Sequence, residues 1–98
     1  MIYAKPGTEG AVVSFESRYE NFIGGKWVAP VKGQYFTNTT PVTGEVICEI
    51  PESTAEDIDL ALDAAHAAKD AWGKTSVQQR SNILLKIADR IEENLEML

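Results

Sequence analysis

Residues 53–98, STAEDIDLALDAAHAAKDAWGKTSVQQRSNILLKIADRIEENLEML, decide the fold of this chain. Ser53 and Glu56 stand at the spacing of a capping box, in which the serine hydroxyl accepts a hydrogen bond from an orphan backbone N–H and the glutamate reaches back to the cap. The pattern predicts a first helix over residues 54–72, with Gly73 as its C-terminal stop.

A second helix is predicted over residues 77–98, because Ser76 and Gln79 repeat the capping box in its glutamine form. Its apolar residues recur at helical spacing and form one stripe: Leu84, Ile87, Ala88, Ile91, Leu95 and Leu98. The short connection between the helices predicts an antiparallel helix pair. Residues 92–98 keep the helical register without a glycine, a proline or a basic last turn, so we interpret the end of the chain as a fragment boundary within or near this helix.

The first helix carries more apolar surface than one neighbour can cover. One face holds Ile58, Ala61, Leu62, Ala65, Ala68 and Trp72, and a second face beside it holds Leu60, Ala64, Ala67 and Ala71. A helix that is apolar over most of its circumference is normally covered on two sides, which indicates that a covering element is missing. The alternative is that alanine, the best helix former, simply tolerates exposure.

Short strands are predicted upstream of the helices. Residues 21–28 form two β-prone runs around Gly24-Gly25 and predict a β-hairpin, because glycine readily adopts the positive φ that such turns need. A phosphate-binding loop would need more glycines and an immediate helix start. Residues 35–37 form another β-prone run, and residues 45–50 alternate as a half-buried strand with Val46, Cys48 and Ile50 on one face.

Composition limits the class of protein. The chain has 98 residues, 44% of them hydrophobic and 24% charged, which predicts one small, core-forming domain or fragment. The predicted strands followed by two helices make its class α+β. A net charge of −6 argues against nucleic acid and anionic membranes as partners. A single cysteine and the lack of a long apolar run predict a cytoplasmic protein without a cleaved leader. Residues 1–20 lack a clear period and are expected to form an extended arm.

Cys48 and His66 are the first two residues considered for chemistry. A nucleophilic cysteine needs a neighbouring base or a positive environment, whereas the strand alternation places Cys48 on the apolar face, so we interpret it as a core residue. His66 has no second ligand at i+4, where Asp70 stands, and we interpret it as a solvated histidine at the edge of the apolar face.

The remaining candidates also favour structural roles. The acidic stripe Glu56, Asp59, Asp63 and Asp70 could bind a cation or a basic partner, but carboxylates spread along a helix do not converge on one ion, so a solvated face is preferred. Trp27 and Trp72 could anchor an interface, although each is expected to pack in a core. Neither a catalytic triad nor a Walker or GxGxxG spacing occurs. We therefore assign no catalytic, cofactor-binding or metal-binding residue.

Four segments in order resemble the N-terminus of the NAD(P)-dependent aldehyde dehydrogenases: NFIGGKWV at 21–28, PVTGEVI at 41–47, AAHAAKDAW at 64–72 and RSNILLKIADRIEEN at 80–94. The resemblance extends over about residues 19–98, and the arm looks closest to the bacterial acetaldehyde dehydrogenase branch. One departure is Thr40, where the family usually has asparagine.

The resemblance implies a much longer enzyme, in which residues 21–98 begin a Rossmann-like coenzyme domain that is followed by a catalytic domain and an oligomerisation extension. It implies that a cysteine thiolate attacks the aldehyde, that hydride passes to NAD or NADP, and that a glutamate-activated water releases the acid. These groups lie downstream of residue 98 in the family, so none maps onto this chain. Some members hold a monovalent cation near the position of Thr39, but the other ligands would also lie downstream.

Two hypotheses follow for the function. The first is a structural N-terminal segment of an aldehyde dehydrogenase that oxidises acetaldehyde or another small aldehyde; alone it is inactive, binds no coenzyme and self-associates, and its partners are the remainder of the chain and further copies in a homo-oligomer. In this hypothesis the coenzyme domain covers the second apolar face of the first helix. The alternative is an independent interaction module that uses the helix pair to dock a partner, without catalysis.

Overall fold

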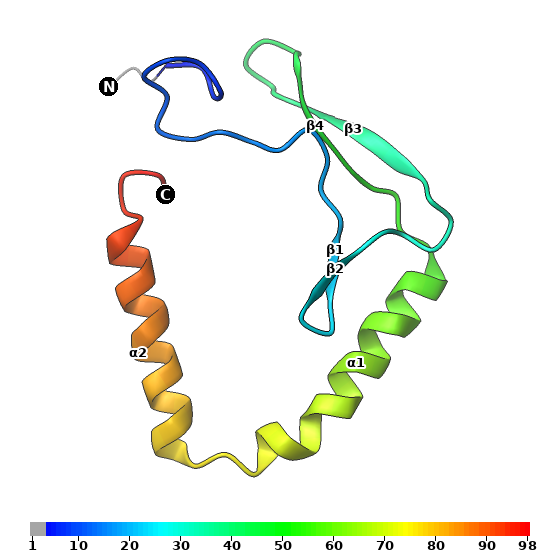
Figure 1. Cartoon of the computed structure of the whole chain (residues 1–98), viewed down its shortest axis with the longest axis vertical. Helices are drawn as coiled ribbons and strands as arrows, with labels where there is room; N and C mark the ends of the chain where they lie inside the picture. Colours follow the sequence, from blue (N-terminus) through cyan, green and yellow to red (C-terminus); the bar gives the residue numbers. More distant parts are fainter. Residues whose placement is uncertain (1–3) are drawn as a thin grey trace. The chain divides into compact units, whose positions relative to one another are not determined.

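The computed structural model describes residues 4–98, in which strands precede helices as predicted (Figure 1). The elements in chain order are β1 (Asn21–Ile23), β2 (Lys26–Val28), β3 (Tyr35–Thr39), β4 (Val46–Pro51), α1 (Ala55–Gly73) and α2 (Val77–Glu93). The strands form two separate antiparallel pairs, β1–β2 and β3–β4. The predicted α+β class, with short antiparallel strands ahead of two helices, is confirmed.

The chain divides into two compact units. One contains Phe15–Lys69, which includes all four strands and most of α1, and the other contains the described residues up to Ser14 together with Asp70–Leu98. The predicted antiparallel packing of the two helices concerns both units and stays a prediction, as does the boundary at residue 20 between the arm and the rest of the chain.

The β1–β2 hairpin has the turn that its glycines predict. Asn21 pairs with Val28 and Ile23 pairs with Lys26, so Gly24 and Gly25 are the two turn residues. Their φ angles are 62° and 79°, a region that side chains with a Cβ rarely adopt. A turn with positive φ at both central residues matches the twist of the flanking strands, which explains this hairpin.

A β-bulge reverses the face of the sheet to which the first side chain of β4 points. Asn38 pairs with Cys48, but its neighbour Thr39 pairs with Val46. Residues paired across a ladder share a face, and neighbours on a strand point to opposite faces, so Val46 and Cys48 lie on opposite faces. The predicted alternation is therefore wrong at Val46, a residue that is 60% exposed.

The residue that precedes α1 is Thr54, one position after the predicted cap, Ser53. The N–H of Thr54 donates to the Oδ2 of Asp57 at 2.9 Å. Ser53 instead accepts a hydrogen bond from the amide of Asn21 at 2.9 Å, and Glu56 forms an ion pair with Lys32 at 3.4 Å. The Ser53–Glu56 box is thus wrong, because each of its side chains has a partner elsewhere in the chain.

The helix α2 begins as predicted but ends earlier. The Ser76 Oγ accepts from Gln79 N–H at 3.1 Å and the Gln79 Oε1 accepts from Ser76 N–H at 2.9 Å, which confirms the capping box. The helix ends at Glu93, where Asn94 serves as C-cap and its side-chain amide donates to the carbonyl of Arg90 at 2.8 Å. The predicted continuation to residue 98 is wrong, since the last turn contains the basic Arg90 and an asparagine closes the helix.

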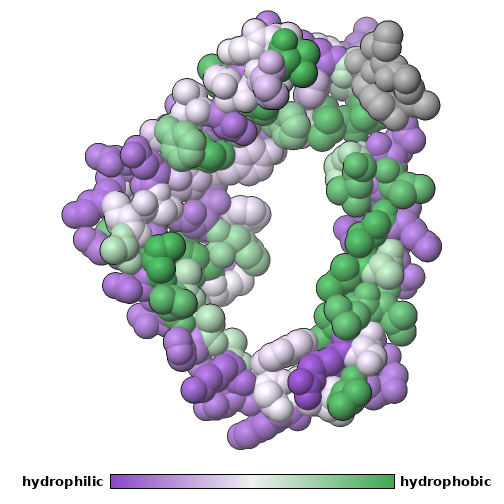
Figure 2. Space-filling model, turned by 180° about the vertical axis from the view of Figure 1, so that it is seen from behind, coloured by the Kyte–Doolittle hydropathy of each residue, from purple (hydrophilic) through white to green (hydrophobic). Residues whose placement is uncertain are grey.

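Little apolar surface is buried among residues 4–98. Cys48 is the single buried residue of the hydrophobic types, at 6% exposure. The apolar side chains of α2, including Leu84, Ile87 and Ile91, are exposed, and Figure 2 shows hydrophobic surface along this helix. Neither helix in the described part of the chain combines the length and the hydropathy that crossing a membrane requires.

Candidate functional site

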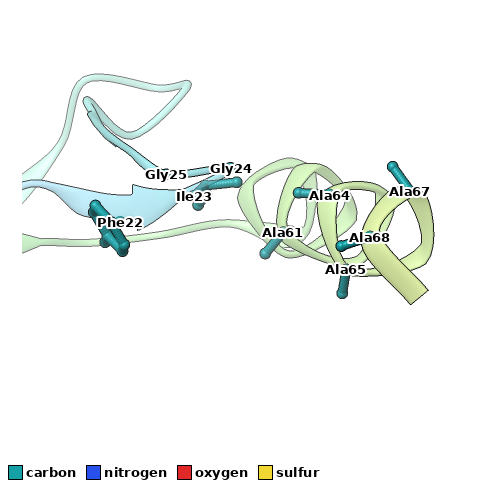
Figure 3. A pocket seen from close by; sticks show the side chains of 9 residues that line it. All are labelled: Phe22, Ile23, Gly24, Gly25, Ala61, Ala64, Ala65, Ala67 and Ala68. Carbon is teal, nitrogen blue, oxygen red and sulfur yellow. The ribbon is translucent and has the colours of Figure 1, made fainter. Parts of the chain in front are cut away.

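A groove lies between the turn of the β1–β2 hairpin and one face of α1 (Figure 3). Its lining residues are small or apolar: Phe22, Ile23, Gly24, Gly25, Ala61, Ala64, Ala65, Ala67 and Ala68. Its volume is about 630 Å³. A Cβ placed on Gly24 would lie 4.0 Å from the Cβ of Ala64, so the turn approaches the helix closely at this point.

The groove offers no group for acid–base or nucleophilic chemistry. None of its nine lining residues has a titratable or nucleophilic side chain. It also does not fit a dinucleotide, because its two glycines lead directly into the strand β2 and not into the N-terminus of a helix that could bind a pyrophosphate. The side chains that line the groove offer contacts to apolar groups.

Cys48 lies in the core, as its place in the alternating strand predicts. It is unpaired and buried on β4, opposite Asn38 of β3. A cysteine nucleophile must reach its substrate and needs a base or a positive charge beside it. This position therefore suits a packing residue.

His66 and the acidic stripe lie on the exposed surface of α1, as predicted for solvated residues. The Nδ1–H of His66 donates to the carbonyl oxygen of Leu62 at 2.9 Å, one turn earlier in the helix. Within residues 4–98, no group of three or more His, Cys, Asp or Glu side chains is placed to hold a metal ion.

The two tryptophans are not core residues in the described chain. Trp27 is 65% exposed and Trp72 is 49% exposed, so the prediction that both pack in a core is wrong. Trp27 contacts the ring of its cross-strand partner Phe22, with ring centroids 5.1 Å apart. Phe22 is 62% exposed as well, so the two-stranded hairpin leaves both rings largely open within residues 4–98.

Asp57 is a buried carboxylate that the sequence analysis missed. The residue is 3% exposed, and its Oδ1 accepts from the N–H of Val31 at 2.8 Å while Oδ2 accepts from the N–H of Thr54 at 2.9 Å. These two backbone donors, that of Thr54 first, lower the pKa of Asp57 below its usual value of 3.8. Asp57 thereby ties the loop between β2 and β3 to the N-terminus of α1. The spacing of Thr54 and Asp57 could have indicated that Asp57 caps the helix. Its contact with Val31 could not be predicted in this way, because the two residues are 26 positions apart.

The protection that Asp57 gives to the Val31 amide depends on pH. Because the folded pKa lies below the unfolded value, the stabilisation is fully present above about pH 4 and is lost as the pH falls through the folded pKa. We expect Asp57→Asn to increase hydrogen exchange at Val31 roughly tenfold at neutral pH, since a charged acceptor is lost.

The matched control is Asp59→Asn, which removes the same charge from an exposed position on the same helix. Exchange at Val31 relative to this control is the quantity to measure between neutral pH and about pH 3. Equal exchange rates in the two variants would show that the carboxylate of Asp57 does not hold this loop.

A second cluster, also missed from the sequence, surrounds Arg18. The Nε of Arg18 donates to the Oε2 of Glu49 at 2.8 Å, and Nη2 forms an ion pair with the same oxygen at 2.8 Å. The guanidinium carbon lies 4.1 Å from the centroid of the Tyr35 ring. The hydroxyl of Tyr35 donates to Glu20 Oε2 at 2.6 Å. This hydrogen bond, with burial, raises the pKa of Tyr35, and the bond to Glu49 raises the pKa of Arg18. The pairing partners are as many as 31 residues apart, so local sequence contains no signal for them.

The comparisons with known proteins agree on one family. A model described as the aldehyde dehydrogenase family matches residues 27–98. The chain is 76% identical over 98 residues to an acetaldehyde dehydrogenase of Pseudomonas aeruginosa, covering 100% of this chain and 19% of that protein. It is 61% identical over 98 residues to a long-chain-aldehyde dehydrogenase of Acinetobacter sp, covering 100% of this chain and 20% of that protein.

A solved structure shares the fold. The crystal structure of an NAD-dependent aldehyde dehydrogenase from Sinorhizobium meliloti matches with a TM-score of 0.77 and 32% identity, over 98% of this chain and 20% of that chain. The chain thus spans about one fifth of the length of the curated and solved relatives that it matches.

Proposed function

The chain belongs to the aldehyde dehydrogenase family, and from this premise we propose that it is the N-terminal structural segment of an NAD(P)-dependent enzyme that oxidises an aldehyde to the carboxylic acid. Its role is to support the coenzyme domain. The observation that carries the proposal is the family match over residues 27–98 in a chain that covers 19% of a relative 76% identical to it.

The properties of the described residues support a structural role. The groove of the hairpin and α1 contains no titratable or nucleophilic side chain, and Cys48 is buried. The nucleophilic cysteine, the base and the coenzyme-binding residues of the enzyme belong to the other four fifths of a family member's length. Neither Cys48 nor His66 takes their place.

The exposed apolar surface of the two helices supports the proposal that the remainder of the enzyme is the partner that covers them. Exposed large side chains occur on both helices, among them Ile58, Leu62, Leu84 and Ile91. Burying such side chains contributes about 1.5–3 kcal/mol each, so a protein gains much by covering them. The polypeptide that follows in the enzyme covers the second face of α1, and further copies complete a homo-oligomer.

The relatives support a proposal for the substrate and the coenzyme. The relative from Pseudomonas aeruginosa, at 76% identity, is named for acetaldehyde, and the one from Acinetobacter sp, at 61%, for long-chain aldehydes. We favour acetaldehyde or another small aldehyde. NAD is favoured over NADP because the solved neighbour is NAD-dependent. The enzyme acts in the cytoplasm, without nucleic acid or membrane as a partner.

The test is to read the gene beyond codon 98, to express the protein that it encodes, and to measure coenzyme reduction with acetaldehyde and with a long-chain aldehyde. We expect an open frame about five times as long as this chain and faster reduction with the short substrate. A stop directly after codon 98 would leave the independent interaction module as the function. A long product without aldehyde oxidation would also contradict the proposal.

A further inference from the structure

Residues 16–20, which we name the strap, lie along the edge of β4 that β3 leaves free. The N–H of Glu49 donates to the carbonyl of Ser17 at 2.9 Å, and the N–H of Tyr19 donates to the carbonyl of Glu49 at 2.9 Å. These two bonds make a parallel bridge between Arg18 and Glu49. The strap therefore occupies both backbone groups that Glu49 directs away from β3.

Sheet edges need such protection. An edge strand with unpaired N–H and C=O groups is a template for pairing with another chain. The strand β4 has the sequence VICEIP, rich in β-prone residues. Its last residue, Pro51, has no N–H to donate, so the protein already blocks one position of β4 without the strap.

Side-chain charge holds the strap in place. Arg18 binds Glu49 through two nitrogens at 2.8 Å and stacks on Tyr35, while Tyr35 binds Glu20 at 2.6 Å. The Arg18 and Glu49 side chains are 51% and 40% exposed. No residue of the strap is buried. Exposed ion pairs are weak and are screened by salt, so a strap held in this way opens easily.

We propose that the strap is a charge-held cover of the β4 edge, and that it prevents this edge from pairing with the β4 edge of a second copy of the chain. Opening of the strap frees the N–H and C=O of Glu49 together, because both are bonded to the strap. The role concerns the sheet alone and is independent of the catalytic function proposed above.

The experiment compares Arg18→Gln with Arg90→Gln in the 98-residue chain. Both substitutions remove one positive charge and break one exposed ion pair, but Arg90 pairs with Glu93 on α2, away from the sheet in sequence. Hydrogen exchange at Glu49 and Tyr19 reports the strap, and thioflavin fluorescence reports β pairing between copies. For Arg18→Gln we expect exchange about tenfold faster at both amides, from loss of the ion pair and the stacking, together with a rise in thioflavin fluorescence.

Each outcome decides the proposal. Unchanged exchange in Arg18→Gln would show that charge does not hold the strap. Faster exchange without thioflavin fluorescence would show that the strap does not prevent pairing. If the variant does not fold, hydrogen exchange and thioflavin fluorescence are measured instead on the unmodified chain in about 1 M salt. The screening length there is about 3 Å, so the ion pair is weakened without a substitution.

Discussion

We expect the purified 98-residue chain to reduce neither NAD nor NADP when it is mixed with acetaldehyde, whereas the longer enzyme proposed above is expected to do so readily. We expect a large difference, because enzymes typically accelerate their reactions by about 10⁶-fold or more, and we assign none of the residues of this chain to that chemistry. Its single thiol, on Cys48, is buried in β4. Its paired glycines, Gly24 and Gly25, form a hairpin turn. The measurement is the absorbance of the reduced nicotinamide over time.

A matched pair of full-length variants extends this prediction to the residue level. Cys48→Ala in the full-length enzyme is expected to retain activity within a few-fold, because it removes a small packed side chain and no reacting group. His66→Gln is the companion variant and is also expected to retain activity, because the exposed histidine bonds to a carbonyl of its own helix. Aldehyde oxidation by the isolated chain, or its abolition by Cys48→Ala in a correctly folded enzyme, would contradict the assignment of a structural role.

The isolated chain will associate with itself, and its apparent mass will rise with concentration in sedimentation. The reason is the apolar surface that the chain does not cover: Leu84, Ile87 and Ile91 form part of one stripe on α2 and all three are exposed. A double substitution, Leu84→Glu with Ile91→Glu, is expected to weaken the association at least tenfold. Burial of one such side chain is worth about 1.5–3 kcal/mol, and about 1.4 kcal/mol corresponds to tenfold.

The control for this prediction is Asn82→Glu, which adds a negative charge to an exposed polar position of the same helix. It is expected to leave the association unchanged within about twofold, since surface substitutions away from packed features have small effects. A compact monomer at high concentration would contradict the inference that the isolated chain exposes more apolar surface than it can bury.

Short-range patterns predicted the secondary structure well. The Ser76–Gln79 capping box and the Gly24-Gly25 turn are both present, because each depends on groups within three residues of one another. The Ser53–Glu56 box was wrong although its spacing was equally good. Ser53 contacts an amide 32 residues away, and a local pattern cannot reveal such a competitor.

The sequence by itself determined that strands precede helices, where the hairpin turns and where α2 begins, and it carried the resemblance to the aldehyde dehydrogenases. It also identified Cys48 as a core residue, since alternation along a strand is a local property. Only the tertiary structure decided that Asp57 holds the loop at Val31, that Arg18 binds Glu49, and that a bulge turns Val46 outward. These features depend on segments that are distant in sequence and meet only in the fold. The residues of one segment therefore do not indicate which distant residues they will contact.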